Sequence, residues 1–483
     1  MGCCYLSSVA EYWKRRRGFI LAAIGSAIGL GNIWRFSWLC YRNGGGAFLV
    51  PYIIFLLVFG IPLMILEFML GYYFRGATPK VFRKIKESLE PIGWIAIINT
   101  FILCTYYSVV LAWVMDYIGL SATVAWKTVE GVGPTFEALL SNPIFVIIGL
   151  AITWLIAWYT CYTGVASGIE RACTYAIPIL WVLSAILVIR GITLPGSDIG
   201  INWLLTPTAQ AFSGSAVIDA AGQILFTLSV FGTTMIVYAS YLPPKSEIPN
   251  SAWITSFANC GFSFFFAFAT WGIIGYLMHV MNVATPADLP VPLGGAGLAF
   301  VTIPTAVTLL PGAPLTTAIF GTVFFIILWL AGYTSLISII EPTFKAFNDK
   351  FGISRKKGVT AVSLLAFLVS LIFAIRPDLI DPVDFMVGST NAVWIVLLEA
   401  IIAGYFFSLK VLRDHVNPDA EWKLGPWFDV LVKFVIPIIL LVVLGWGLAT
   451  TVHVSPVSIL TVIIIIIAAT AISGLKWREE KVM

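Results

Sequence analysis

The chain has 483 residues, of which 59% are hydrophobic and only 11% are charged. A soluble globular protein carries roughly 25% charged residues, and 34 Phe, 18 Trp and 17 Tyr are too many aromatic residues for a disordered chain. The composition therefore excludes a soluble enzyme and an intrinsically disordered protein, whereas the net charge of +4 selects no class of partner. What remains is a protein that crosses a membrane many times.

Twelve apolar segments follow one another along the chain, each close to the roughly 20 residues that a membrane-spanning helix needs. We expect these helices at about residues 19–40, 47–70, 94–118, 144–161, 174–191, 218–241, 252–280, 314–344, 359–375, 385–408, 428–449 and 456–475. The longest polar connections lie at about residues 71–93, 119–142, 192–216, 281–312 and 409–426. None of them is long enough to form a soluble domain, so the sequence predicts a single membrane domain over residues 1–483.

The Lys and Arg residues indicate how this domain is oriented. With the N-terminus in the cytoplasm, the 28 Lys and Arg residues divide into 23 on the inner side and 5 on the outer side. Cytoplasmic loops of membrane proteins carry an excess of positive charge. The sequence therefore predicts a multi-pass protein of the plasma membrane, with both termini in the cytoplasm and an even number of spans.

The first and sixth apolar segments contain residues that weaken a helix. Residues 25–32 read Gly-Ser-Ala-Ile-Gly-Leu-Gly-Asn, and residues 227–234 read Thr-Leu-Ser-Val-Phe-Gly-Thr-Thr. Each glycine inside a helix costs about 1 kcal/mol, and a broken backbone is tolerated in hydrocarbon only where it lines a cavity. The alternative is that Gly25 and Gly29 merely let two helices pack closely.

The two weak segments occupy matching places in two sets of five helices. This is the pattern of secondary transporters built from inverted repeats, which bind substrate and ions at the breaks. The sequence thus predicts a first repeat over about residues 10–191, a second over about 218–408, and two further helices over about 428–475.

Motifs of enzymes and of ATP-driven pumps are absent from the sequence. It has no G-x-x-x-x-G-K-[ST], H-E-x-x-H or G-x-S-x-G. The histidines His279, His415 and His453 are scattered singly, which disfavours a metal site. We expect a protein that is not an enzyme and has no catalytic residues. Uphill transport would then depend on an ion gradient, since one charge that crosses 100 mV supplies about 2.3 kcal/mol.

Several long motifs together resemble the signature of the neurotransmitter:sodium symporter family. They are Gly29-Leu30-Gly31-Asn32-x-x-Arg35-Phe36, Asn43-Gly44-Gly45-Gly46-Ala47-Phe48, Pro51-Tyr52, Gly60-Ile61-Pro62-Leu63-Met64-x-x-Glu67, Gly222-Gln223-x-x-Phe226-x-Leu228-Ser229, Tyr238-Ala239-Ser240-Tyr241, Ala331-Gly332-x-Thr334-Ser335 and Asp384-Phe385. The resemblance covers essentially the whole chain. It implies an all-α, LeuT-like fold of twelve transmembrane helices, in which a 5+5 inverted repeat contains broken helices 1 and 6.

The resemblance also implies two sodium sites made only of oxygen atoms, which suit a hard monovalent cation. The first site would use the carbonyl of Ala27, the side chains of Asn32, Thr227 and Asn259, and the substrate carboxylate. The second would use the carbonyls of Gly25, Ile28 and Ala331 and the hydroxyls of Thr334 and Ser335. For these two hydroxyls the alternative is a hydrogen bond to a preceding carbonyl of their own helix.

The implied substrate is a neutral α-amino acid, because Gly29 stands where the monoamine carriers of the family have an aspartate. A substrate that brings its own carboxylate could bind sodium and the backbone N–H groups near the break. The implied substrate-binding residues are Ser26, Ala27, Leu30, Gly31, Leu103, Tyr107, Phe226, Thr227, Ser229, Phe231, Gly232, Ser335 and Ile339. The aromatic residue of the sixth helix, Phe231, lies one place earlier than the family pattern, so either Phe231 crowds the pocket or Gly232 enlarges it.

A chloride site is a further implication of the resemblance. Chloride-independent bacterial members carry a carboxylate at the position of Ser263. The implied chloride ligands are Tyr52, Gln223, Thr227, Asn259 and Ser263. Two sodium ions in a low-dielectric core favour a negative charge nearby, although these residues could instead form an ordinary polar contact between helices.

Two sets of gate residues are implied as well. Arg35 and Asp384 would form an outer ion pair above Tyr107 and Phe226, unless Asp384 belongs to a solvated loop end. Trp13, Tyr241 and Asp349 would close the inner side. The N-terminal arginine of the family falls on Ala10, so Lys14 or one of residues 15–17 would have to replace it as the partner of Asp349. Glu67 and Glu399 are interpreted as buried polar anchors.

Together these features predict a sodium-coupled, chloride-dependent symporter that moves a small or hydrophobic neutral amino acid across the lipid bilayer by alternating access. A membrane amino-acid sensor on the same scaffold is the alternative. An ion channel is disfavoured, because the ligands converge on one enclosed site and do not form repeated rings. Nucleic acid is not an expected partner.

Overall fold

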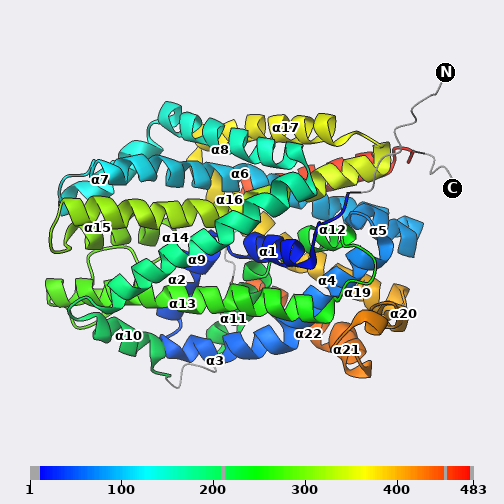
Figure 1. Ribbon diagram of the computed structural model, residues 1–483, viewed down its shortest axis with the longest axis horizontal. Helices are drawn as coiled ribbons and strands as arrows, with labels where there is room; N and C mark the ends of the chain where they lie inside the picture. Colours follow the sequence, from blue (N-terminus) through cyan, green and yellow to red (C-terminus); the bar gives the residue numbers. More distant parts are fainter. Residues whose placement is uncertain (1–10, 208–212, 451–453, 479–483) are drawn as a thin grey trace.

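The computed structural model describes residues 11–207, 213–450 and 454–478, and within these ranges the regular elements are all helices (Figure 1). In the described part of the chain, ten helices are long and apolar enough to cross a membrane. They span Gly46–Phe74, Glu87–Ala122, Pro143–Thr163, Val165–Ile192, Pro249–Met281, Leu315–Phe351, Arg355–Ile375, Pro377–Phe406, Pro426–Gly447 and Pro456–Ser473. The all-α prediction is confirmed.

Two further segments of the described chain are interrupted helices, which confirms the two predicted breaks. Helix α1 (Arg16–Ala27) is followed by η1 (Gly31–Arg35) and α2 (Phe36–Arg42), and the two halves are bent by 59°. Helices α11 (Gly214–Thr227) and α12 (Thr234–Ser240) flank the second break, where Ser229 and Gly232 have φ values of 53° and 69°. These interrupted helices bring the number of crossings close to the twelve expected.

The uninterrupted helices surround the broken ones. They include α3 (Gly46–Phe55), α4 (Ile61–Phe74), α6 (Glu90–Ala122), α8 (Pro143–Thr163), α9 (Glu170–Ile192), α13 (Pro249–Met281), α16 (Leu315–Phe351), α17 (Arg355–Ile375), α19 (Ala392–Ile401), α22 (Ile436–Thr450) and α23 (Pro456–Ser473). Helix α1 packs against α9, α13 and α16. Figure 1 shows α9, α13 and α16 crossing the molecule with the shorter α1 and α12 in the middle. The breaks are therefore held inside protein.

The outer surface of the bundle is apolar. Side chains such as Ile144, Leu155, Val182, Ile438 and Ile467 are more than half exposed on α8, α9, α22 and α23. An exposed apolar surface of this extent marks a contact with hydrocarbon or protein. With the hydropathy of the helices, it identifies a multi-pass membrane protein.

The segments expected as polar connections contain short helices. They are α5 (Thr78–Ile85), α7 (Val129–Leu140), α10 (Ser197–Leu205), α14 (Gly295–Gly297), α15 (Ile303–Thr308) and α20 (Leu409–Val416). In α5, Val81 and Phe82 are buried, whereas Lys84 lies on the outside. Such a helix covers an end of the bundle with one apolar face. It is much shorter than the roughly 20 apolar residues by which a membrane-spanning helix is recognised in a sequence.

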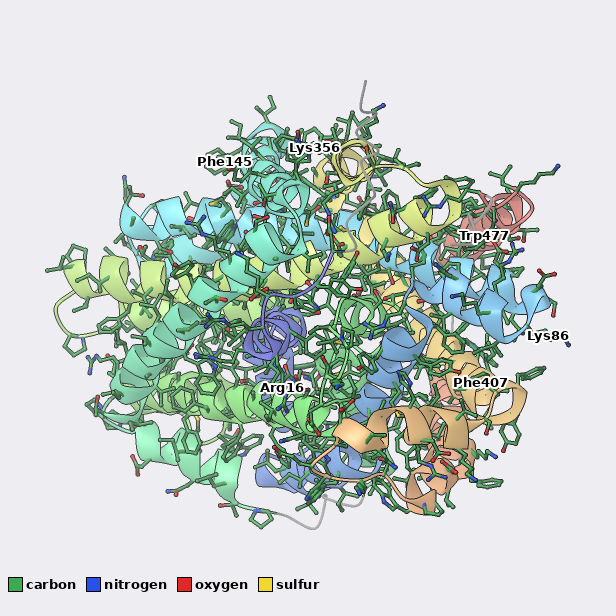
Figure 2. All side chains as sticks on the ribbon, turned by 45° about the vertical axis from the view of Figure 1, so that its right-hand side comes forward. Arg16, Lys86, Phe145, Lys356, Phe407 and Trp477 are labelled. Atoms are coloured by element: carbon green, nitrogen blue, oxygen red, sulfur yellow. The ribbon has the colours of Figure 1, made fainter. Side chains whose placement is uncertain are left out.

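The first and last described residues lie at the same end of the molecule. Glu11 pairs with Arg355 at the start of α17, and the backbone N–H of Arg478 donates to the Lys350 carbonyl at the end of α16. Figure 2 shows Lys86, Phe407 and Trp477 on the same side of the molecule, at its right-hand end. This arrangement agrees with an even number of crossings, and we call this end the inner end.

Close approach of α4 and α12 requires glycine at position 71, because a methyl group there would overlap the Ile236 carbonyl oxygen. Gly71→Ala should therefore destabilise the fold by about 1–3 kcal/mol, as overpacking does, and lower the unfolding temperature of the purified protein in detergent. Gly261→Ala is the matched control, since no atom lies within 4 Å of the added methyl. Equal unfolding temperatures for the two variants would contradict this assignment of close packing.

Candidate functional site

A small cavity of about 60 Å³ lies between the two helix breaks. Its walls include all of the predicted substrate-binding residues except Gly232, namely Ser26, Ala27, Leu30, Gly31, Leu103, Tyr107, Phe226, Thr227, Ser229, Phe231, Ser335 and Ile339. They come from α1, η1, α6, α11, α16 and the segment between α11 and α12. Their role as substrate ligands stays a prediction, but the fold brings them to one place.

Gly232 lies outside this wall. Its backbone N–H donates to Glu67 Oε1 over 2.9 Å, and a Cβ atom on Gly232 would lie 3.0 Å from Glu399 Oε2. Phe231, in contrast, lines the cavity. Of the two outcomes left open by the sequence, the structure therefore favours a pocket narrowed by Phe231 over one enlarged by Gly232.

The end of α1 leaves backbone carbonyl groups without helical partners. Ile28 is extended (ψ 103°), so the helix ends there. The Ser26 carbonyl accepts hydrogen bonds from Ser229 (3.0 Å) and Ser335 (3.1 Å), so it joins the first break to the second and to α16. Freed carbonyl groups thus face hydroxyl groups inside the protein.

The predicted ligands of the second sodium site gather beside this point. Ser335 Oγ lies 3.3 Å from the Ile28 carbonyl and 3.2 Å from the Ala331 carbonyl, and Thr334 Oγ1 lies 3.1 Å from the same Ala331 oxygen. A Cβ atom on Gly25 would contact Thr334 at 3.2 Å. Both hydroxyls donate to carbonyls of their own helix here, and Ser335 also lies within hydrogen-bond distance of the Ser26 and Ile28 carbonyls at the break.

The side chains expected at the first sodium site form one buried hydrogen-bonded group. The Asn32 amide nitrogen lies 2.8 Å from Asn259 Oδ1, 3.0 Å from Thr227 Oγ1 and 2.8 Å from Ser263 Oγ. The Asn32 oxygen accepts from the Gly29 N–H at 2.8 Å. Four segments, η1, α11, α13 and the first break, therefore meet through oxygen and amide groups without a charged side chain.

Unpartnered donors lie on the far side of this group. The Tyr52 hydroxyl and the Gln223 side-chain amide are buried, and neither finds a hydrogen-bond partner among the described residues. Tyr52, on α3, lies beside Ser263 and Cys260 of α13, and α3 packs against α11, which carries Gln223. A buried polar group without a partner costs about 1–3 kcal/mol, so these donors indicate a missing acceptor.

The outer end of the site is open. A second cavity, of about 780 Å³, extends from Leu30 and Phe226 past Arg35 to Asp219, Asp378 and Asp381. Arg35 lies over the Phe226 ring at 4.6 Å, while Asp384 accepts from the Tyr106 hydroxyl at 2.7 Å. The two predicted gate residues thus flank the entrance, and among the described residues the ion pairs do not join them.

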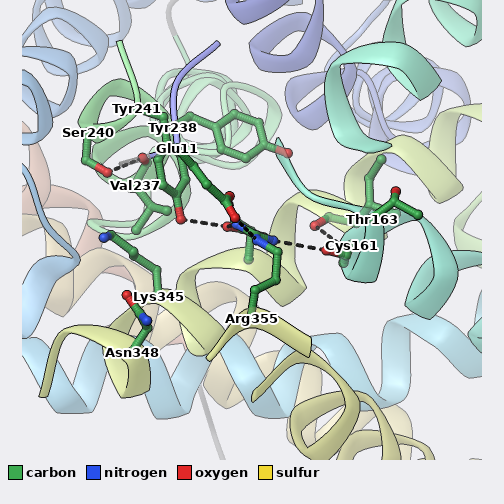
Figure 3. A network of polar contacts seen from close by, with 12 residues as sticks. Glu11, Cys161, Thr163, Val237, Tyr238, Ser240, Tyr241, Lys345, Asn348 and Arg355 are labelled. Atoms are coloured by element: carbon green, nitrogen blue, oxygen red, sulfur yellow. Dashed lines mark hydrogen bonds and ion pairs between the residues drawn. The ribbon is translucent and has the colours of Figure 1, made fainter. Parts of the chain in front are cut away.

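The inner end is closed by a network centred on Arg355 (Figure 3). The Arg355 guanidinium binds both carboxylate oxygens of Glu341 (2.6 and 2.9 Å), Glu11 and the Cys161 carbonyl (3.0 Å). The Tyr241 hydroxyl donates to Glu341 at 2.6 Å. The network links the N-terminal segment, α8, the end of α12, α16 and α17.

The partner expected for Asp349 is not the one in the structure. Asp349 pairs with Lys345 of the same helix (2.9 Å) and accepts from the Ala77 N–H (2.8 Å). Trp13, by contrast, does join the inner closure, because its indole N–H donates to the Tyr238 carbonyl at 2.7 Å. Among the described residues, no ion pair connects Asp349 to Lys14 or to residues 15–17.

Sequence reasoning missed Glu11, Glu341 and Arg355. A signal was present for Glu341, because a carboxylate within the apolar segment 314–344 is costly and marks a functional position. Arg355 precedes Lys356 and Lys357, and this run was interpreted only as an orientation signal. Glu11 had no signal, since its partner is 344 residues away.

Comparisons with known proteins agree with this geometry. The profile of the sodium:neurotransmitter symporter family matches residues 10–139 and 140–461, which include both breaks. An uncharacterised sodium-dependent transporter of Methanocaldococcus jannaschii is 40% identical over 449 residues, which are 89% of this chain and 89% of the relative. The human sodium- and chloride-dependent GABA transporter 2 is 28% identical over 86% of this chain and 76% of its own length. The solved structure of MhsT in complex with L-phenylalanine has a TM-score of 0.78 at 27% identity, over 90% of this chain and 99% of MhsT.

The inner network can be tested through the buried thiol of Cys161. Arg355→Gln leaves Glu341 without its cation, and breaking one partner of a buried ion pair costs about 3–5 kcal/mol. The inner end should then open more often, so that a membrane-permeant maleimide labels Cys161 at least about tenfold faster. Mass spectrometry of the Cys161 peptide, in a Cys3→Ser/Cys4→Ser background, measures the rate.

Arg376→Gln is the control, because Arg376 forms an exposed ion pair with Asp378 away from this network. In the Arg376→Gln variant, the maleimide should label Cys161 at the wild-type rate. An unchanged rate in Arg355→Gln would show that the network does not hold the inner end closed.

Proposed function

Because the chain belongs to the sodium:neurotransmitter symporter family and is a sodium-dependent membrane transporter, not an enzyme, we propose that it is a symporter of a neutral amino acid that works by alternating access. The observation that carries this proposal is the cavity between the two unwound segments. It offers backbone and hydroxyl groups to a zwitterion, and the nearest ionisable carboxylate is Asp384, which is shared with the outer cavity.

The surroundings of Gly29 support a substrate that brings its own carboxylate. A Cβ atom at Gly29 would lie 3.0 Å from Ser335 Oγ and 3.3 Å from the Tyr107 hydroxyl. No side-chain carboxylate reaches an amine from this position. The Tyr107 hydroxyl is buried and has no hydrogen-bond partner among the described residues, so it could donate to a substrate carboxylate. The solved relative MhsT was crystallised with L-phenylalanine, which is an amino acid of this kind.

The size of the cavity favours a small side chain. A volume of about 60 Å³ holds on the order of five water-sized groups, since one water needs roughly 10–15 Å³. This room matches a small neutral amino acid. A bulky side chain would require Phe226 or Phe231 to move, and their rings are 6.1 Å apart across the break.

The oxygen atoms around the breaks fit two sodium ions. At one position the carbonyls of Ile28 and Ala331 and the hydroxyls of Thr334 and Ser335 would hold a cation. At the other position, the side chains of Asn32, Thr227 and Asn259 and the substrate carboxylate would together bind the second sodium ion. Each ion would replace hydrogen bonds that now tie the first break to its neighbours, so ion binding and the conformation of the break are linked. A ligand shared by ion and substrate makes their affinities mutually dependent.

Chloride is the proposed third ion. Among the described residues, the Tyr52 hydroxyl and the Gln223 side-chain amide have no hydrogen-bond partner, and Tyr52 lies beside Ser263. An anion there would satisfy them and balance two sodium charges in a medium of low dielectric constant. The similarity to a sodium- and chloride-dependent transporter agrees with this assignment.

An open outer end and a closed inner end correspond to the outward-facing state of an alternating-access cycle. Substrate would enter past Arg35 and Phe226. Arg35 could then leave the Phe226 ring to pair with Asp384, while the Arg355 network would have to open for release. In this scheme both termini face the cytoplasm, as the distribution of Lys and Arg predicts.

Flux tests the transport proposal directly. In proteoliposomes, the purified protein should accumulate at least one small neutral amino acid when an inward sodium gradient is imposed.

Asn32→Ala removes one sodium ligand. It should raise the sodium concentration that gives half-maximal binding of the amino acid by about tenfold, equivalent to about 1.4 kcal/mol. A scintillation binding assay over a sodium titration measures the shift.

Asn142→Ala is the matched control, because Asn142 caps the start of α8 far from the breaks and should leave sodium dependence unchanged. Binding without flux would instead indicate an amino-acid sensor. An unaltered sodium titration in Asn32→Ala would remove Asn32 from the sodium site.

Chloride dependence forms a separate prediction. Replacement of chloride by gluconate should reduce sodium-driven uptake to a small fraction of its rate, because no counter-charge then reaches Tyr52 and Gln223. Ser263→Glu supplies a fixed carboxylate and should restore uptake in gluconate, whereas Ser263→Ala should not. Uptake at full rate by the wild-type protein in gluconate would exclude a chloride requirement.

A further inference from the structure

A long apolar cavity lies at the edge of the bundle, apart from the cavity between the breaks. Its walls come from α6, α16, α17 and α23, and its volume is about 620 Å³. Leu365, Ile372 and Ile464 line it and are each at least half exposed, so the cavity opens toward the surroundings of the bundle. Figure 1 shows α17 at an edge of the molecule. The described lining contains no ionisable side chain, so this cavity is suited to hydrocarbon.

The cavity is long enough for a lipid chain. On α17 its lining runs from Gly358 to Phe373, which is about 23 Å along the helix axis. The hydrocarbon of one bilayer leaflet is about 15 Å thick. Gly358 lies near the start of α17, at the inner end of the molecule. An acyl chain of the inner leaflet can therefore lie in the cavity along its length.

One wall of the cavity carries a hydroxyl group that lacks a partner. Thr343 is buried, and its Oγ1 has no hydrogen-bond partner among the described residues, whereas the Thr461 hydroxyl donates to the Val457 carbonyl. Thr343 lies about 12 Å along α16 from its inner end at Phe351. A buried hydroxyl without an acceptor is unfavourable. The ester carbonyl of a phospholipid, which lies just below the headgroup, would supply an acceptor at this depth.

Positive charge surrounds the inner mouth of the cavity. Ile353 and Gly358 line the mouth, and Lys357 directly precedes Gly358. The Arg478 guanidinium lies against Gly352, where its Nη1 would be 2.7 Å from an added Cβ atom. Lys357 and Arg478 are exposed, and the ion pairs among the described residues include neither of them. Helix α17 also begins here without an acidic residue in its first turn, so the positive end of its dipole adds to the two cations.

We propose that this cavity binds one anionic phospholipid of the inner leaflet. One acyl chain fills the apolar cavity, an ester carbonyl accepts from the Thr343 hydroxyl, and the phosphate lies between Lys357 and Arg478. A sterol would cover the apolar walls and leave both cations without a partner. Free phosphate would meet the cations and leave the apolar walls uncovered. The assignment of the lipid does not depend on the proposed transport function.

A bound lipid would support two helices that also form the cavity between the breaks. Ile102 of α6 lines the lipid cavity, and the next residue, Leu103, lines the cavity between the breaks. Helix α16 likewise contributes Thr343 to the first and Ile339 to the second. A ligand that binds the folded protein and not the unfolded chain stabilises the fold. Phosphatidylglycerol should therefore raise the unfolding temperature of the delipidated protein.

Native mass spectrometry tests the charge requirement. The full-length protein, delipidated in detergent, is titrated with phosphatidylglycerol or phosphatidylcholine. The first phosphatidylglycerol should bind at least about tenfold more tightly than phosphatidylcholine, because basic residues attract anionic lipid. Lys357→Gln/Arg478→Gln should lose this preference. Lys410→Gln/Lys423→Gln, which removes two exposed lysines on and after α20, should keep it. Equal affinity of the wild-type protein for the two lipids would overturn the proposal.

The cavity itself is tested by filling it. Ala468 of α23 lines the cavity, so Ala468→Trp should weaken the binding of both lipids at least about tenfold. Ala471→Trp, at an exposed position of the same helix, should not. Thr343→Val removes the hydroxyl and keeps the shape, and it should weaken both lipids about threefold. If Ala468→Trp does not fold, Thr343→Val and the charge variants decide. Unchanged binding in a folded Ala468→Trp variant would overturn the proposal.

Photo-cross-linking identifies the occupant. In nanodiscs, phosphatidylglycerol with a diazirine near the end of one acyl chain should label peptides of α17 and α23, and an excess of soluble glycerol phosphate should not reduce the labelling. Displacement by glycerol phosphate, or labelling confined to other helices, would overturn the proposal. A second copy of the chain would instead appear as a dimer that does not require phosphatidylglycerol and is lost in Ala468→Trp, which would also overturn it.

Discussion

The whole arrangement depends on one constraint, which is that unpaired backbone groups cannot face hydrocarbon. Two helices stop in the middle of the bundle, and each freed carbonyl or N–H must find a partner inside the protein. The Ser26 carbonyl finds the hydroxyls of Ser229 and Ser335, and the Gly232 N–H finds Glu67. In the function proposed above, ions and a zwitterion would replace the partners that these groups have here.

Side chains with a formal charge are kept away from the two helix breaks, and Asp384 is the one charged residue in the described lining of the central cavity. Amides and hydroxyls, including those of Asn32 and Thr334, surround the breaks, while ion pairs such as Arg355–Glu341 lie near the inner end. Uncharged polar groups at the breaks can receive a cation and a zwitterion together, and they leave no unpaired charge behind when both ligands leave. Fixed charges at the ends serve a different purpose, since they bind segments that must separate for access.

The sequence predicted the breaks and most of the cavity, but not the inner closure. Glycine-rich stretches at matching positions are a local signal, and the resemblance to the family then supplied the residues that line the cavity. The Arg355 network could not be predicted in this way, because it joins Glu11 to a residue 344 positions away. Asp349 was assigned a partner from the N-terminal segment, yet a lysine one helical turn away was nearer. Long-range pairing of charges depends on how helix ends pack, which periodicity does not encode.

The position of Arg355 has a consequence for leakage. One guanidinium binds two carboxylates and a carbonyl from three separate segments, so a partial opening would leave a buried cation or a buried anion with too few partners. Such an intermediate lies higher in free energy than either the sealed or the fully hydrated end. The inner end therefore tends to open in one cooperative step. A cooperative seal limits the time during which both sides are accessible, and it protects the ion gradient from being dissipated without cargo.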